Sequence, residues 1–348
     1  MSAAPRKLRP LRLALAGFGS AGRQFAERLL GAYGRELRAR GFEPRVTGIA
    51  TARHGIAVDR AGLPLKKALA LVRADRSLAA LHQGGPVRST LEFVRTVPAD
   101  VLFEISPLEP RTGRPALDHA RAALRRGIHV VTANKGPVAH GRRALQRLAQ
   151  QHGVQFRHEG TVLDGMPIFN LAERCLPGAR ILGFRGLLNS TTTRILSRME
   201  EGASFDSALR EAQAAGVAEA DPRNDLEGWD AAVKACTLAN ALMGADLRPA
   251  DVERQGIAGI SAEEVSDARH AGRRLRLIVR AWRDGRRVRV KVAPEAVPAD
   301  DLLVSRDCDG VLVLETDLMG EIGLWEGRGG VDQTAYALFA DLVAAVGA

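Results

Sequence analysis

The chain has 348 residues, enough for two domains, and its hydrophobic fraction of 46% is that of an ordinary globular protein. The three cysteines, Cys175, Cys236 and Cys308, are too few and too widely spaced for a disulfide framework or a zinc site. The formal net charge of +10 raises nucleic acid as a partner, but basic residues are spread along the chain and aromatic residues make up only 4%. We therefore expect no nucleic-acid partner. No apolar run has the length of a membrane span or follows the pattern of a signal peptide, so we expect no membrane partner and a cytoplasmic location.

Lysine is rare among the basic residues. Of the 50 lysines and arginines, only six are lysine: Lys7, Lys66, Lys67, Lys135, Lys234 and Lys291. The lysine ammonium is compact and loses its proton more readily than the guanidinium of arginine, which stays charged. A lysine in a segment that otherwise predicts chemistry therefore favours a functional role.

The N-terminal pattern is that of a dinucleotide-binding βαβ unit. Residues 11–16 predict a buried strand, residues 20–40 a helix and residues 46–50 a second strand. The loop between the first strand and the helix has the form G-x-G-x-x-G, which allows a tight turn, a close approach of pyrophosphate and close helix packing. A tight turn that binds nothing is the alternative. We expect the pyrophosphate of a nicotinamide dinucleotide to lie against Gly17, Gly19, Ser20, Ala21 and Gly22.

The end of the second predicted strand bears on the choice of dinucleotide. An acidic residue there would bind the ribose 2′-hydroxyl of NAD, and residues 50–54 contain none. Arg53 is placed to meet a 2′-phosphate, with help from Lys66 or Lys67. The pattern favours NADP over NAD, and the alternative is that Arg53 is an ordinary surface arginine.

Residues 1–155 predict an α/β domain of the Rossmann type, with a doubly wound parallel sheet. Residues 55–98 show only short helices and loops, after which the alternation of strand and helix returns. Ligands of such sheets lie beyond the carboxyl ends of the strands, and the segment Thr132-Ala133-Asn134-Lys135 lies at such an end. The expected strands are 101–105, 127–132 and 154–156, and the expected helices are 114–126 and 140–152.

Residues 156–327 predict an α+β domain with a mostly antiparallel sheet. A polar turn is expected at residues 189–193, and Asp284-Gly285 is expected to form the turn of a hairpin over 275–292. Further strands are expected at 180–188, 311–315 and 322–325, and helices at 205–215 and 226–243. The closing helix, within residues 328–348, is expected to return to the first domain.

Asp230 and Lys234 lie four residues apart on a predicted helix and share one of its faces. An ordinary surface ion pair is the simplest interpretation. The helix is otherwise apolar or small, however, and lysine is rare in this chain, so the pair is expected to be buried. Four carboxylates precede it and would suit a substrate ammonium group: Glu219, Asp221, Asp225 and Glu227.

Several of these segments resemble the homoserine dehydrogenase family, and the resemblance covers nearly the whole chain. The most specific is the run from residue 218 to residue 234, with its acids, glycine and lysine in the family's register. The TANK segment at 132–135, the segments 158–168, 186–192 and 315–320, and Gly329-Gly330 with Thr334 also resemble the family. The chain resembles the short form without a C-terminal ACT domain, so feedback by threonine through such a domain is not expected.

The resemblance implies reduction of the aldehyde of aspartate semialdehyde to homoserine by a reduced nicotinamide, in threonine and methionine biosynthesis. It implies that Lys234 is the general acid, that Asp230 orients it, and that Lys135 shares its role. It also implies that the substrate is bound by Glu219, Asp225 and Thr191.

The resemblance further implies ligand and subunit contacts. The dinucleotide would also be contacted by Asn134, Lys135, Gly330 and Thr334. A monovalent cation, Na⁺, would be held by Glu159 and the backbone carbonyls of Val162, Asp164 and Met166, a set of oxygen donors that does not suit zinc. The family forms homodimers through the sheet of its second domain, so a homodimer is expected.

Four positions depart from the family pattern: Leu163, Asp164, Ser190 and Arg328. They leave open a sister dehydrogenase that acts on another amino-acid-like carbonyl. A non-catalytic dinucleotide-binding sensor is a second alternative. The joint presence of Lys135, Glu219, Asp230 and Lys234 argues against a sensor.

Overall fold

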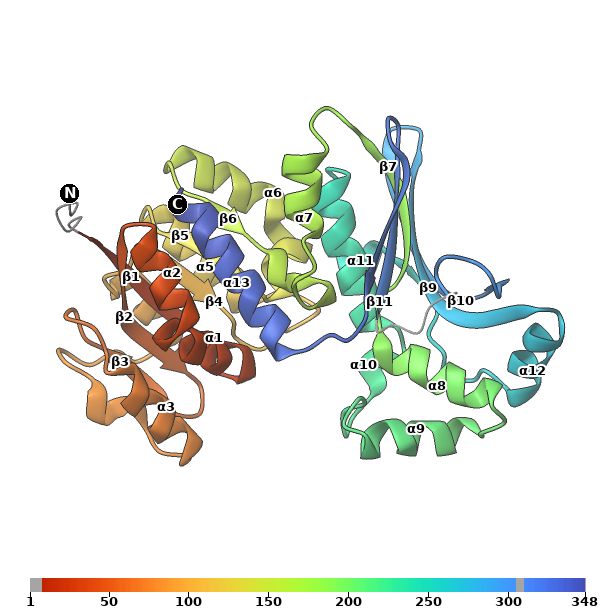
Figure 1. The fold of residues 1–348 in the computed structure, drawn as a ribbon, viewed down its shortest axis with the longest axis horizontal. Coiled ribbons are helices and arrows are strands. Elements are labelled where there is room, and N and C mark those ends of the chain that lie inside the picture. The colour runs from red at the N-terminus through yellow and green to blue at the C-terminus, as the bar shows by residue number, and fades with distance from the viewer. Residues whose placement is uncertain (1–7, 305–309, 348) are drawn as a thin grey trace, which may run out of the picture. The chain divides into compact units, whose positions relative to one another are not determined.

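The computed structural model describes residues 8–304 and 310–347, so the expectation for Cys308 lies outside the described residues. The described residues form two compact units. One runs to Ile168 and resumes at Gly330, and the other is Phe169–Gly329 (Figure 1). In the part of the chain that is described, no helix is both long and apolar enough to cross a membrane.

The first unit is built on a six-stranded sheet with the order β3-β2-β1-β4-β5-β6. Neighbouring strands are parallel except β3, which pairs antiparallel with β2. The prediction of a Rossmann-type sheet is confirmed, and this order places the ligand crevice beyond the carboxyl ends of the central strands β1 and β4. The strands are β1 (Arg9–Ala16), β2 (Phe42–Thr51), β3 (Gly55–Val58), β4 (Val101–Glu104), β5 (His129–Thr132) and β6 (Phe156–Arg157).

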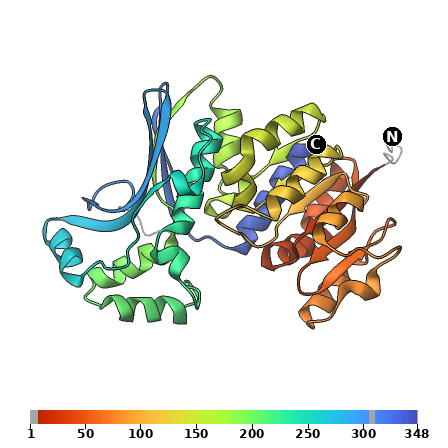
Figure 2. The ribbon, with the colours of Figure 1, turned by 180° about the vertical axis from the view of Figure 1, so that it is seen from behind.

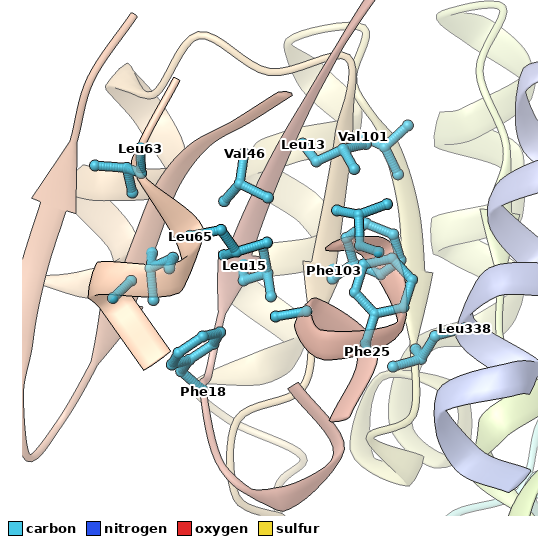
Figure 3. Packing of buried hydrophobic residues seen from close by; sticks show 14 of the residues in the cluster. Leu13, Leu15, Phe18, Phe25, Val46, Leu63, Leu65, Val101, Phe103 and Leu338 are labelled. Carbon is cyan, nitrogen blue, oxygen red and sulfur yellow. The ribbon is translucent and has the colours of Figure 1, made fainter. Parts of the chain in front are cut away.

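Alternate side chains of β1 point into two separate cores. Leu13 and Leu15 pack in one cluster with Phe25 and Leu338, as Figure 3 shows. Ala14 lies in the other cluster, with residues of α4, α5 and α6. Helices α1 and α13 lie side by side (Figure 1), and Figure 2 shows the sheet from behind, where α5 and α6 pack together. The helices are α1 (Ser20–Leu30), α2 (Ala32–Ala39), α3 (Leu65–Arg73), α4 (Thr90–Thr96), α5 (Ala116–Arg125), α6 (Lys135–Gln151) and α13 (Val331–Val346), with short turns η1 (Leu78–Leu81), η2 (Glu159–Thr161) and η3 (Leu163–Gly165).

Three local features of this unit differ from expectation. The helix expected over 20–40 is broken at Gly31, whose φ of −117° and ψ of −110° are not helical. Residues 55–98 contain a strand, β3, which forms a hairpin with β2. The helix expected from residue 140 already begins at Lys135, because the side chain of Asn134 accepts a hydrogen bond from the backbone N–H of Gly136 and caps the helix.

The second unit has a six-stranded sheet with the order β12-β11-β7-β9-β10-β8, antiparallel except between β8 and β10, which confirms the predicted class. In the hairpin of β9 and β10, Asp284 pairs with Arg287. The turn is therefore Gly285-Arg286, one residue later than expected, and the φ of +60° at Gly285 suits glycine. The strands are β7 (Ile181–Leu187), β8 (Glu253–Arg254), β9 (Arg273–Asp284), β10 (Arg287–Pro298), β11 (Gly310–Thr316) and β12 (Gly320–Glu326).

The helices of the second unit differ from expectation in two places. The polar turn expected at 189–193 is the cap and first turn of a helix, α8. The helix expected over 226–243 begins only at Trp229, as α11, because its cap Gly228 has a φ of +77°, and the preceding residues form a separate short helix, α10. The helices are α8 (Ser190–Glu200), α9 (Phe205–Ala214), α10 (Arg223–Leu226), α11 (Trp229–Leu242) and α12 (Ala262–His270), with short elements α7 (Ile168–Asn170), η4 (Leu171–Cys175) and η5 (Pro249–Asp251).

Candidate active site

The glycines of the first loop have two different roles. Gly17 has a φ of +108°, and a Cβ there would lie 2.3 Å from the carbonyl oxygen of Ile105. A Cβ on Gly22 would lie 2.8 Å from the Ile105 side chain. These two glycines let the loop and α1 pack against the end of β4. A Cβ on Gly19, in contrast, would meet nothing within 4 Å, so this glycine keeps space open on the side where a ligand would approach.

Helix α1 begins directly after Gly19, and no side chain caps it. Its first backbone N–H groups, at Ser20 and Ala21, belong to the end of the helix that carries partial positive charge. Such an end binds phosphate groups. The loop therefore suits the pyrophosphate of a dinucleotide, because it leaves open space at Gly19 and offers the free backbone N–H groups at the start of α1.

Arg53 lies in the turn between β2 and β3 and pairs with Asp75, at 2.7 Å between Nη2 and Oδ2. Both side chains are exposed, and an exposed pair of this kind contributes little stability. Lys66 and Lys67 are exposed in the first turn of α3. The structure thus gives Arg53 an acidic neighbour that was not predicted from the sequence. Because the ion pair is exposed and weak, a phosphate that binds Arg53 would displace Asp75 at little cost in free energy.

Asn134 joins the ends of two strands. Its side chain caps α6 and also donates to the backbone carbonyl of Ser106, at 2.9 Å. The Thr132 hydroxyl donates to the backbone carbonyl of Glu104, at 2.7 Å. The buried Asn134 therefore positions α6, and with it the half-buried Lys135 at its first position, beyond the carboxyl ends of β4 and β5.

A buried acid at the end of β4 escaped sequence reasoning. Glu104 is fully buried; its Oε1 accepts a hydrogen bond from the Ser106 hydroxyl at 2.5 Å and lies 3.2 Å from Nδ1 of the buried His119. Its Oε2 has no hydrogen-bond partner among the described residues. The signal in the sequence was a glutamate that ends an apolar strand, one residue before the Ile105 against which Gly17 packs.

In the second unit, Asp230 and Lys234 form a close pair on α11. Oδ2 of Asp230 lies 2.7 Å from Nζ of Lys234, and each side chain is only 19% exposed. Nζ of Lys234 also donates to the backbone carbonyl of Leu188, at 2.6 Å. The pair is largely shielded from water and tied to a second element, unlike an ordinary surface ion pair.

Asn189 is the residue that organises this polar cluster, which we define as Asn189, Asp225, Asp230 and Lys234. Its Oδ1 accepts a hydrogen bond from the backbone N–H of Thr192 and caps α8. Its Nδ2 donates to Oδ1 of Asp225 at 2.7 Å and to Oδ2 of Asp230 at 3.1 Å. Asn189 was not among the predicted site residues; the signal was its capping position between a strand and a polar run.

Burial raises the pKa of the Asp225 carboxyl above its usual range, and the nearby Asp230 adds to this, against the hydrogen bond from Asn189. The Thr191 hydroxyl donates to the backbone carbonyl of Val217, at 3.0 Å, and so ties α8 to the segment that leads to Glu219. Glu219 itself is exposed, and its backbone carbonyl accepts a hydrogen bond from Gln213. The structure thus brings Asp225 into the polar cluster, whereas the hydrogen bond at Glu219 is made by its backbone carbonyl to Gln213.

The remaining predicted residues lie around α13 in the first unit. Gly330 caps α13, and the Thr334 hydroxyl donates to its carbonyl at 3.3 Å. Glu159 is buried, and its backbone N–H donates to Asp341 of α13 at 2.7 Å. In the predicted cation loop, Val162 is buried and Met166 is half-buried, and Asp164 has a φ of +42°.

The described residues contain no cluster of three or more histidine, cysteine or acidic side chains that would hold a metal ion. The predicted cation site is of another kind, with one carboxylate, that of Glu159, and backbone carbonyls of a loop in an unusual conformation. Leu163 and Asp164 both have positive φ, +49° and +42°. Such a loop turns successive carbonyls in directions that regular structure does not allow, which fits a weakly bound Na⁺.

Two family profiles match the chain. The one described as homoserine dehydrogenase matches residues 167–343, and the one described as its NAD-binding domain matches residues 17–159. A homoserine dehydrogenase of Methanocaldococcus jannaschii is 40% identical over 283 residues, which cover 81% of this chain and 83% of the relative. The chain belongs to the homoserine dehydrogenase family.

Two further members of the family differ in the dinucleotide that their names give. An NAD(+)-dependent homoserine dehydrogenase of Pseudomonas canavaninivorans is 38% identical, over 79% of this chain and 80% of the relative. A hyperthermophilic archaeal homoserine dehydrogenase, solved in complex with NADPH, has a TM-score of 0.80 and 29% identity and covers 97% of this chain and 98% of its own. Family membership makes this protein an NAD(P)-dependent oxidoreductase and leaves its preference between the two dinucleotides open.

Proposed function

We propose that the protein catalyses the reversible, NADP-dependent reduction of aspartate semialdehyde to homoserine, in the cytoplasm and as a step of threonine and methionine biosynthesis. The observation that carries this proposal is the shielded pair of Asp230 and Lys234, held to the Leu188 carbonyl and to Asn189. In this arrangement residues 1–155, with the closing helix, bind the dinucleotide, and residues 156–327 bind substrate, carry the proton-transfer group and dimerise.

The bound dinucleotide supplies the hydride. Lys234 donates the proton to the aldehyde oxygen, on which negative charge develops, and accepts it back when homoserine is oxidised. Asp230 and the Leu188 carbonyl, both within 2.7 Å of Nζ, hold the ammonium in one position. Lys135, at the first position of α6, shares the stabilisation of that oxygen.

Substrate binding follows from the carboxylates. Burial raises the pKa of Asp225 because the charged carboxylate is removed from water, and the nearby Asp230 adds to the effect. A substrate ammonium group compensates the charge of this carboxylate, with Glu219 as a second carboxylate. The Thr191 hydroxyl, which fixes the segment before Glu219, completes the substrate site.

The preference for NADP rests on Arg53, Lys66 and Lys67, and on the absence of an acid at 50–54. These three cations are exposed and would pair with a 2′-phosphate. The pyrophosphate would be held by Gly17, Gly19, Ser20, Ala21 and Gly22, and the nicotinamide half by Asn134, Lys135, Gly330 and Thr334. A Na⁺ bound by Glu159 and by the carbonyls of Val162, Asp164 and Met166 would hold the cation loop in its conformation.

We also propose a homodimer formed through the sheet of the second unit. Trp282 and Trp325 are 40% and 52% exposed. They lie on one face of the sheet, because residues that pair across strands share a face, as do residues an even number apart on one strand. Trp282 pairs through Gly183 with Glu315 of β11. Trp325 pairs with Val311, four residues before Glu315 on the same strand. Two exposed tryptophans on one sheet face are typical of an interface. The molar mass by light scattering tests this, and a monomer at working concentration would contradict it.

The decisive experiment is steady-state oxidation of homoserine with NADP and, separately, with NAD. We expect turnover with both and a higher kcat/KM with NADP. Dinucleotide binding without turnover would favour a sensor. Turnover of another amino alcohol in place of homoserine would favour a sister dehydrogenase, as the departures at Leu163 and Arg328 allow.

A further inference from the structure

A second polar pocket lies in the second unit. It has a volume of about 550 Å³ and is lined by α8 from Thr193 onward, the end of β7, the end of α12, the start of β9 and part of the segment 299–304. No residue of the polar cluster lines this pocket, although its wall begins beside the cap of α8, with Thr193, and ends at Glu200 and Glu201. The pocket has the size of a small-molecule site.

Part of the pocket wall is a compensated ion cluster. The carboxylate of Glu200 accepts from Arg276 at 2.6 Å and from Arg274 at 2.9 Å. Glu200 and Arg276 are both more than nine-tenths buried. Two arginines thus share one carboxylate in a shielded position, which leaves positive charge in excess even before the rest of the wall is considered.

Two more arginines line the pocket, and neither pairs with a carboxylate among the described residues. Arg269 donates to the backbone carbonyl of Glu200, and Arg273 donates through Nε to the backbone carbonyl of Ala296, at 3.0 Å. In the described part of the wall the remaining acid is Glu201, which pairs with Arg198, a residue that does not line the pocket. Among the described residues of the wall, the four arginines therefore share one carboxylate, that of Glu200, which already pairs with Arg274 and Arg276.

The chemistry of this wall favours binding over catalysis. Guanidinium groups do not titrate near neutral pH, and each offers five N–H donors in a planar fork that matches phosphate and carboxylate oxygens. Ser197 and Thr193 of α8 add hydroxyl groups to the same wall. We infer that this pocket binds a small multivalent anion, a phosphate ester, pyrophosphate or polycarboxylate, at a site separate from the dehydrogenase site.

The test is calorimetric titration of the full-length protein with pyrophosphate and, separately, with citrate. Saturating NADP is present throughout, so that the glycine loop and Arg53 are already occupied. We expect saturable binding with one site per chain. In the double variant Arg269→Gln/Arg273→Gln, whose glutamines keep a donor for each carbonyl, we expect the Kd to rise about tenfold or more. A preference for one anion identifies phosphate or carboxylate chemistry.

The matched control is Arg286→Gln/Arg287→Gln, at the other end of the same hairpin. Like the test variant it removes two positive charges, but from exposed positions that do not line the pocket. We expect its Kd to equal that of the wild type. An equal loss in both double variants would show non-specific attraction by net charge and overturn the proposal, as would absence of saturable binding up to about 10 mM. Because turnover is not the readout, these outcomes are independent of whether homoserine is the substrate.

Discussion

The two units prepare their sites in opposite ways. In the first unit the glycine loop works by what its residues lack: Gly17 and Gly22 have no Cβ to strike Ile105, and Gly19 leaves open space. In the second unit the polar cluster works by buried side chains that depend on one another, with Asn189 bonded to both Asp225 and Asp230. The first site is therefore damaged by added atoms and the second by lost hydrogen-bond partners.

The largest expected effect comes from Lys234. Lys234→Ala removes the proton donor, and kcat should fall by about 10³-fold while the Kd for NADP stays near the wild-type value. Lys234→Arg keeps the charge but holds its proton too firmly to act as acid and base, so it should be almost as inactive. Lys291→Ala, at a half-buried lysine on β10 that pairs with Glu253 at 3.6 Å, is the control and should retain full activity. Substantial activity in Lys234→Arg would limit Lys234 to electrostatic stabilisation.

The glycine loop is tested by two matched substitutions. Gly17→Ala forces a Cβ against the Ile105 carbonyl at a φ of +108°, and we expect a loss of about 3 kcal/mol in the free energy of unfolding. Gly19→Ala meets no protein atom, so the melting temperature should be unchanged while the Kd for NADP rises about tenfold. Thermal unfolding and dinucleotide titration of both variants separate the two roles. A destabilised Gly19→Ala would contradict the assignment of open space to the ligand.

Substitution of Asn189 tests how strongly the residues of the polar cluster depend on one another. Asn189→Ala removes the cap of α8 and the hydrogen bonds to both carboxylates, and we expect a loss of about 2 kcal/mol in unfolding free energy. The two carboxylates then repel each other without an intervening donor, so KM for homoserine should also rise. Ser204→Ala, which removes only the cap of α9, is the control for capping and should leave KM unchanged. Equal kinetic effects would reduce Asn189 to a helix cap.

The smallest effect is a pH-dependent change in stability at Asp225. Burial raises the pKa of this carboxyl in the folded protein, so its contribution to folding is present at low pH and is lost as the pH rises through the folded pKa. Asp225→Asn keeps an acceptor for Asn189 and carries no charge. We expect the variant to be more stable than wild type at about pH 7 and equal to it only below about pH 3, with a raised KM for homoserine. Equal stability at all pH values would mean that the charge of Asp225 is already compensated.

Local sequence was sufficient for elements whose physics is local. The glycine loop between a buried strand and a helix, and the four-residue spacing of Asp230 and Lys234, depend on neighbours along the chain. The class of both sheets also followed, because the order of strands and helices constrains how they pair. Boundaries were less accurate: a single non-helical residue, Gly31, broke one predicted helix, and one capping residue, Asn134, began another earlier than expected.

What the tertiary structure alone decided are the pairings between distant residues. Asn189 meets carboxylates 36 and 41 residues away, and Arg53 meets Asp75. In the wall of the second polar pocket, Glu200 of α8 pairs with Arg276 of β9, more than 70 residues further along the chain. Spacing along the chain carries no information on such pairs, because the folding of intervening segments determines which side chains share a shielded volume. Local patterns along the chain were enough to predict the family, the class of the two sheets and the residue types of the site. Only the fold shows which of those residues compensate one another's charge.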